Sequence, residues 1–191
     1  MKQAIALVFL VTAACVSPAS DSGSERENSA VVPEPRVASR SYPAYPQRGS
    51  SRLADIVVVD KSDRILVAYS RGEPIAVYRG LQFGDAPFGH KRFEGDERTP
   101  EGIYTIHTRN PNSSYHLSLR IDYPNSADRA FAARYGRSAG GDIFIHGQPN
   151  GLPSNRRMHG DWTDGCIALT NAEIEELWSI VPDGTPIEIR Q

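Results

Sequence analysis

Short apolar runs rich in β-branched residues recur through the chain from about residue 53 onward. "DIVVVD" (55–60) and "ILVAYS" (65–70) flank the polar stretch "KSDR" (61–64), a pattern that predicts a β-hairpin. "IAVYRGLQFG" (75–84) continues the pattern as a third strand. Five further strands are predicted at "IYTIHT" (103–108), "HLSLRIDY" (116–123), "GDIFIHG" (141–147), "CIAL" (166–169) and "IEIR" (187–190).

Helical signals are confined to two segments. "NSADRAFAARYG" (125–136) begins with polar residues, continues with helix formers and ends at Gly136. "TNAEIEELWSIV" (170–181) opens with a capping box, Thr170 followed three residues later by Glu173. Its apolar residues then recur at helical spacing, which predicts a face packed against a sheet.

Many short strands and few helices predict a mainly β domain with two or three short helices. Strands of this length favour a mixed or antiparallel barrel or sandwich over a parallel sheet. One long segment (84–102) is crowded with Gly, Pro and charged residues, so we expect a loop there. A loop of that length inside a compact domain usually has a function.

The first 52 residues read differently from the rest. Lys2, the apolar run 4–11 and the small residues before Cys15 predict a signal peptide over residues 1–15. Cys15 stands where a lipoprotein signal carries its lipidated cysteine, although Thr12 replaces the usual leucine, so a lipid anchor is left open. Residues 16–52 are rich in Ser, Pro and Gly and predict a flexible tether. We therefore expect an exported protein of the periplasm or cell envelope, with its folded domain at residues 53–191.

Charge and cysteine content narrow the function. A formal net charge of −2 gives no basic surface for nucleic acid, so no nucleic-acid partner is expected. The chain has two cysteines, and processing at Cys15 would leave Cys166 unpaired. A single thiol in an exported protein is either an inert buried residue or a nucleophile.

His146 is the matching candidate base, because it ends an apolar strand and an imidazole titrates near neutral pH. The alternative is a structural histidine that hydrogen-bonds to a loop. Gly147 follows the histidine and Gly165 precedes the cysteine, which leaves room for substrate beside both. An adjacent imidazole would lower the pKa of the thiol, and the amides of Gly165 and Cys166 would form an oxyanion hole.

These residues resemble a known signature. "IHG" (145–147) followed by "TDGCIALTN" (163–171) resembles the L,D-transpeptidase catalytic domain of the YkuD type. "GDERTPEGIYTI" (95–106) is similar to the family's strand-entry motif, and "YHLSLRIDYPNSADR" (115–129) resembles the YafK-type murein branch. Two positions depart from the pattern: Asp164 replaces a histidine and Ala168 replaces an arginine, whose place Arg156 or Arg157 would take.

The resemblance implies a YkuD-like fold that acts on peptidoglycan stem peptides without metal or organic cofactor. Cys166 would attack the carbonyl of the third stem residue, with His146 as base and then acid. An acceptor amine or water would resolve the thioester. Substrate-binding or orienting roles are assigned to seven further residues: Gly147, Thr163, Asp164, His116, His159, Arg156 and Asn171.

Three alternatives remain. An L,D-carboxypeptidase or amidase would use the same pair of residues but release a wall-linked peptide or lipoprotein by hydrolysis. A non-catalytic wall-binding module would keep Cys166 only as a core residue. A zinc site is the least supported, since one cysteine and scattered histidines form no ligand cluster.

Overall fold

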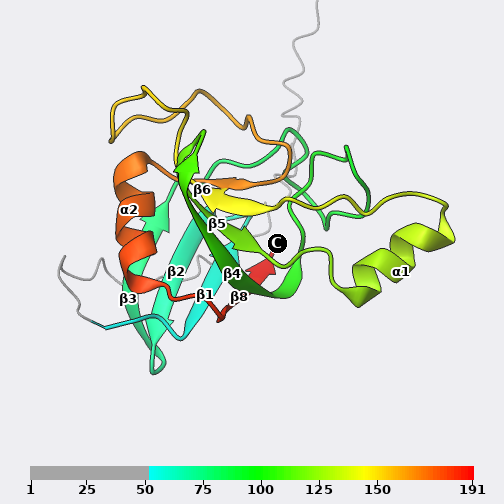
Figure 1. Ribbon diagram of the computed structural model, residues 1–191, viewed down its shortest axis with the longest axis horizontal. Coiled ribbons are helices and arrows are strands. Elements are labelled where there is room, and N and C mark those ends of the chain that lie inside the picture. Colours follow the sequence, from blue (N-terminus) through cyan, green and yellow to red (C-terminus); the bar gives the residue numbers. More distant parts are fainter. Residues whose placement is uncertain (1–51) are drawn as a thin grey trace, which may run out of the picture. The chain divides into compact units, whose positions relative to one another are not determined.

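The computed structural model describes residues 52–191, so the predicted signal peptide, Cys15 and nearly all of the predicted tether lie outside the described residues. Within them the chain forms eight strands and two helices (Figure 1). In chain order these are β1 (Ile56–Asp60), β2 (Ile65–Ser70), β3 (Glu73–Arg79), β4 (Gly102–Ser113), β5 (His116–Ile121), α1 (Ser126–Arg134), β6 (Phe144–His146), β7 (Ile167–Ala168), α2 (Asn171–Ile180) and β8 (Thr185–Arg190). Neither helix has the length and apolarity that crossing a membrane requires.

All eight strands belong to one curled mixed sheet with the order β3-β2-β1-β8-β4-β5-β6-β7. The pairs β1/β8 and β6/β7 are parallel, and the other pairs are antiparallel. The segment after β3 crosses to the opposite end of the sheet, where Gln82 forms an antiparallel bridge with Ala168 of β7. The sheet therefore curls until its two edges meet, which confirms the predicted mixed β architecture.

Several strands differ in length from the sequence prediction. The third strand ends at Arg79, because Gly80 has a positive φ of 70° that interrupts the extended backbone. β6 begins only at Phe144, since Asp142 also has a positive φ, of 54°. β4 instead runs beyond the predicted residue 108, to Ser113, because its polar end continues to pair with β5.

Both predicted helices form, and both have capped N-termini. Asn125 caps α1 in a capping box with Asp128, and Thr170 caps α2 in the predicted box with Glu173. α2 buries its apolar face against β5 and β6, with three fully or nearly buried residues: Ile174, Leu177 and Ile180. This packing fixes the position of the α2 N-terminus beside the end of β6.

The long loop between β3 and β4 folds back against the turn that precedes β7. The backbones of Gly84 and Thr163 form an isolated parallel β-bridge. The hydroxyl of Thr99 donates a hydrogen bond to the carbonyl oxygen of Gly165 at 2.9 Å. At Gly84 the backbones are so close that an added Cβ would lie 2.3 Å from the carbonyl oxygen of Glu97 and 2.7 Å from that of Thr163. The loop is thus part of the domain's structure.

We predict that Gly84→Ala lowers the free energy of unfolding by about 1–3 kcal/mol, because the methyl group would collide with rigid backbone atoms. Gly141→Ala is the control, since its Cβ would meet nothing nearer than 3.8 Å. Urea unfolding of both variants measures the difference. Equal stability of the two variants would contradict the close approach at Gly84.

Candidate active site

The register of β6 and β7 brings Cys166 and His146 together. His146 pairs with Ala168, and Cys166 lies two residues before Ala168. Because alternate residues of a strand face the same side of a sheet, the side chains of Cys166 and His146 share one face. Twenty residues of chain separate the two, and the parallel pairing makes them neighbours.

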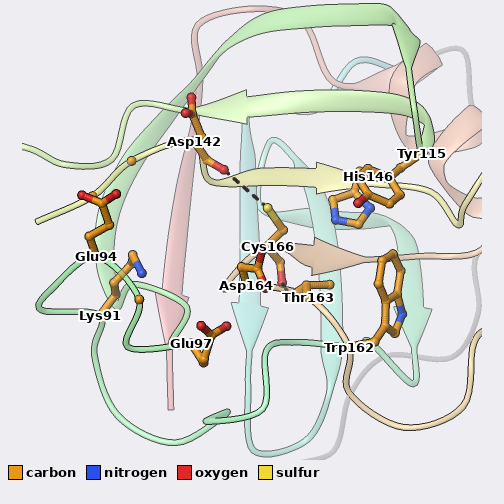
Figure 2. A pocket seen from close by; sticks show the side chains of 13 residues that line it. Lys91, Glu94, Glu97, Tyr115, Asp142, His146, Trp162, Thr163, Asp164 and Cys166 are labelled. Atoms are coloured by element: carbon orange, nitrogen blue, oxygen red, sulfur yellow. Dashed lines mark hydrogen bonds between the residues drawn. The ribbon is translucent and has the colours of Figure 1, made fainter.

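Both side chains line one pocket of about 370 Å³ (Figure 2). Thr163 and Asp164 line it too, together with the aromatic residues Tyr115 and Trp162. Sulfur and imidazole are therefore both reachable from a common cavity, which is the arrangement that nucleophile and base require.

His146 is held in one tautomer. Its Nδ1 lies 2.6 Å from the carbonyl oxygen of Gly147, and because a carbonyl only accepts, Nδ1 must carry the proton. Nε2 is then the unprotonated nitrogen, and it has no hydrogen-bond partner among residues 52–191. The ring stacks on Tyr115 at 4.7 Å and meets the Trp162 ring edge-on at 5.5 Å, so its plane is fixed from both sides.

Burial keeps this imidazole neutral. His146 is 3% exposed, and desolvation lowers its pKa to about 4, against which the hydrogen bond to Gly147 acts only weakly. A neutral imidazole with a free Nε2 can accept a proton throughout the neutral range. His146 thus has the protonation state of a general base.

The thiol of Cys166 is neutral as well. Burial raises its pKa to about 11, and the carboxylates of Asp164 and Asp142 add to the effect, while a backbone hydrogen bond from Phe144 opposes it. The thiol of Cys166 donates a hydrogen bond to the carbonyl oxygen of Asp142, 3.5 Å from the sulfur (Figure 2). The expected lowering of the thiol pKa is not found in this state, because burial raises the pKa of Cys166 and a neutral imidazole carries no charge that would lower it. The pair is poised as thiol and base, and the proton has to move when substrate arrives.

A tight turn presents the cysteine. The hydroxyl of Thr163 donates to the carbonyl oxygen of Cys166 at 2.8 Å and accepts from the amide of Gly165 at 3.3 Å. Gly165 has a φ of +116°, and a Cβ there would lie 2.4 Å from the carbonyl oxygen of Arg98, so glycine is required. The oxyanion role of the Gly165 and Cys166 amides stays a prediction, with the Gly165 amide directed at Thr163 in this state.

Asn171 and Gly147 help to fix the backbone next to His146. The side-chain oxygen of Asn171 accepts a hydrogen bond from the amide of Gln148 at 2.7 Å. A Cβ at Gly147 would lie 2.6 Å from that oxygen. Asn171, the first residue of α2, thereby fixes the backbone that follows His146, so its role in this structure is positioning of the base.

Three predicted residues lie away from the pocket lining. His116 pairs with Glu175 of α2 at 2.7 Å, and His159 and Arg156 are exposed in the loop before Asp161. Arg157, the other candidate for the missing arginine, pairs with Glu173 at 2.5 Å and so secures the α2 N-terminus. The structure brings none of these four side chains to the sulfur.

Two buried glutamines were not anticipated from the sequence. Gln148, fully buried, donates to the side chain of Gln82 at 3.1 Å and to the carbonyl oxygen of Leu169 at 2.6 Å. Gln82 in turn accepts from the indole N–H of Trp162 at 3.2 Å. This network orients the indole that packs against His146. The only sequence signal was the position of Gln148 two residues after the histidine.

The pocket is acidic. Glu94, Glu97 and Asp164 line it without an ion-pair partner among the described residues, whereas Lys91 is paired with Asp96 at 2.9 Å. Across residues 52–191 no three His, Cys, Asp or Glu side chains are grouped so that they could hold a metal ion.

The two pKa values predict how the thiol reacts with a small alkylating reagent. Since the thiolate is the reactive form and the pKa of Cys166 is raised to about 11, the alkylation rate should rise about tenfold per pH unit from pH 7 to 10. Stopped-flow measurement with iodoacetamide, and Cys166→Ser as the blank, tests this. A plateau that begins below pH 8 would contradict the neutral pair.

The chain is similar to several known proteins. The family model "L,D-transpeptidase catalytic domain" (YkuD) matches residues 54–189. The protein named "Putative L,D-transpeptidase YafK" in Escherichia coli is 26% identical over 187 residues, which cover 95% of this chain and 64% of that protein.

Solved structures show the same fold. The helical cell shape determining protein Pgp2 from Campylobacter jejuni is 28% identical with a TM-score of 0.56, over 74% of this chain and 49% of that one. Bd1075 from Bdellovibrio bacteriovorus is 27% identical with a TM-score of 0.50, over 76% of this chain and 51% of that one. The chain thus spans less than two thirds of the curated relative and about half of each solved one. Because the family model covers most of the chain, the protein belongs to the YkuD family of L,D-transpeptidase catalytic domains.

Proposed function

We propose that the domain catalyses acyl transfer from peptidoglycan stem peptides through a thioester on Cys166. The observation that carries the proposal is that one accessible pocket is lined by both the thiol of Cys166 and a buried, neutral imidazole whose Nε2 is unprotonated. Family membership supports the substrate class.

The proposed reaction has two halves. Nε2 of His146 takes the thiol proton as the sulfur attacks the carbonyl carbon of the third stem residue. The tetrahedral intermediate collapses, its C–N bond breaks, and the imidazolium returns the proton to the departing amine. An acceptor amine or water then attacks the thioester, gives up its proton to His146, and the thiol is restored. The amides of Gly165 and Cys166 would stabilise the oxyanion in both halves.

Hydrolysis is the second candidate outcome, and the acidic lining favours it. Glu94, Glu97 and Asp164 surround the place where an acceptor amine would bind. Nearby carboxylates favour the ammonium form, which is not a nucleophile, whereas attack by water is not weakened in this way. The domain would then act as an L,D-carboxypeptidase, or as an amidase that releases a wall-linked peptide or lipoprotein.

The cellular role follows from the substrate. We place the protein in the periplasm or cell envelope, where peptidoglycan lies, with lipidation of Cys15 as a further proposal. Pgp2, a structural relative, determines helical cell shape, so we extend a role in wall remodelling and cell shape to this chain. The wall-binding alternative gains no support, because the thiol shares an accessible pocket with a histidine whose Nε2 is unprotonated.

We predict that Cys166→Ala abolishes turnover of muropeptides and changes the free energy of unfolding by less than about 1 kcal/mol, because the side chain is small and at the edge of the pocket. His146→Ala should lower turnover about 10²–10⁴-fold through loss of the general base. Mass spectrometry of defined tetrapeptide muropeptides measures both. Full activity of either variant would exclude the proposed roles.

The pH profile is a separate test of the base. Because the pKa of His146 is lowered to about 4, turnover should persist at pH 5 and fall only near pH 4. An activity loss centred near pH 6.5 would contradict a buried neutral imidazole.

Transfer and hydrolysis are separated by the product. Muropeptides are incubated with and without an added D-amino acid. Transfer, the leading proposal, gives an exchanged tetrapeptide as the main product when the D-amino acid is present. A tripeptide as the main product of both incubations would instead favour hydrolysis, and Glu97→Gln should then increase exchange if the acidic lining is the cause.

A further inference from the structure

Helix α1 stands apart from the sheet that holds the site (Figure 1). Only Asp128 and Ala132 of its residues are buried, unlike the apolar face of α2. Its packing partner is the loop between β3 and β4, through three mutually contacting rings. Phe93 lies 5.9 Å from Phe131 and 5.7 Å from Tyr135, and the last two are 5.1 Å apart. Tyr135 remains 62% exposed.

Three exposed arginines surround these rings. The guanidinium of Arg92 lies 4.4 Å from the Phe131 centroid, that of Arg134 lies 5.1 Å from it, and that of Arg137 lies 3.9 Å from the Phe93 centroid. None of the three forms an ion pair with any residue of the described chain. We call the three rings and three arginines the α1 patch.

The acidic residues near the α1 patch are mostly engaged elsewhere. Asp96 pairs with Lys91, and Asp128 contacts His90 at 3.1 Å and Tyr104 at 3.0 Å. Glu94, exposed, is the nearest acidic residue along the chain and turns into the pocket lining (Figure 2). Three like charges are thus gathered without local neutralisation.

The aromatic rings make this clustering of arginines physically possible. A guanidinium close to an aromatic ring is stabilised by the negative face of that ring, which offsets part of the mutual repulsion of the arginines. Each exposed guanidinium keeps N–H donors with which it can bind a carboxylate. The α1 patch therefore has the properties of a surface that binds an anion.

The α1 patch is connected to the pocket. The amide of Glu94 donates to the carbonyl oxygen of Ser138 at 2.9 Å, which joins the two loops behind the patch. A second hollow, of about 410 Å³, includes Ser138 and shares Glu94, Gly140, Gly141 and Asp142 with the lining of the Cys166 pocket. A polymer bound at the pocket can thus continue along this hollow toward α1.

We infer that the α1 patch docks the carboxylate-bearing peptidoglycan polymer beyond the stem peptide that reacts at Cys166. The carboxylates in the pocket lining do not favour a polyanionic polymer, so a cationic surface outside the pocket would add to its affinity. This inference rests on the proposed function. It assigns polymer binding to the α1 patch, apart from the residues that react at Cys166.

The test compares polymer with fragment. We replace two arginines of the α1 patch in Arg134→Gln/Arg137→Gln and use Arg71→Gln/Arg79→Gln, exposed at either end of β3, as the control with equal charge change. We expect about tenfold weaker co-sedimentation with purified peptidoglycan sacculi for the patch variant, with the difference vanishing at 1 M salt. Turnover of a soluble muropeptide and alkylation of Cys166 should be unchanged in both variants.

Three outcomes overturn the inference. Equal sacculus binding by both variants means that the α1 patch does not dock the polymer. Weakened binding to anionic phospholipid vesicles, with sacculus binding intact, means that it faces a membrane. Lower muropeptide turnover or a lower melting temperature in the patch variant alone assigns it a structural role. If neither wild type nor control turns over muropeptides but sacculus binding still depends on the patch, the proposed function fails and the docking surface stands.

Discussion

The site depends on one short pairing between the two ends of the sheet. The main-chain N–H of Gln82 donates a hydrogen bond to the carbonyl oxygen of Ala168 at 3.1 Å. The main-chain carbonyl oxygen of Gln82 accepts one from the N–H of Ala168 at 2.8 Å. β7 has only two residues, and without this pairing it would be an edge strand held by β6 alone. With it, Ala168, two residues after Cys166, is paired on both sides, so the closure of the sheet helps to fix the position of the sulfur.

The side chain of Gln82 extends the same constraint into the loop before β7. Its amide nitrogen donates to the carbonyl oxygens of Met158 and Gly160, while its oxygen accepts from Gln148 and Trp162. A buried amide that satisfied only some of these bonds would destabilise the domain, so the network has essentially one arrangement. Backbone closure places the nucleophile, and the glutamine pair places the indole against the base.

Local signals predicted the elements but not how they close. The hairpin at β1 and β2, the two helices and the capping box at Thr170 all follow from residue type and spacing. The bridge from Gln82 to Ala168 does not, because a single bridge between segments 86 residues apart has no periodicity. The raised pKa of Cys166 also escaped prediction, since it depends on how far the folded chain desolvates the thiol. His116 and His159 looked like candidates by residue type alone, and only the fold shows that they face elsewhere.

The hydrogen-bond acceptor that orients the imidazole of His146 is the carbonyl oxygen of Gly147, an atom of the main chain. In many hydrolases that task falls to a carboxylate, which a single substitution can delete. Here the acceptor is a main-chain carbonyl, so a substitution can remove this hydrogen bond only indirectly, by changing the backbone conformation at Gly147. Direct substitution can therefore remove only two of the three groups, the side chains of Cys166 and His146, and the third, the Gly147 carbonyl, persists as long as the backbone keeps its fold.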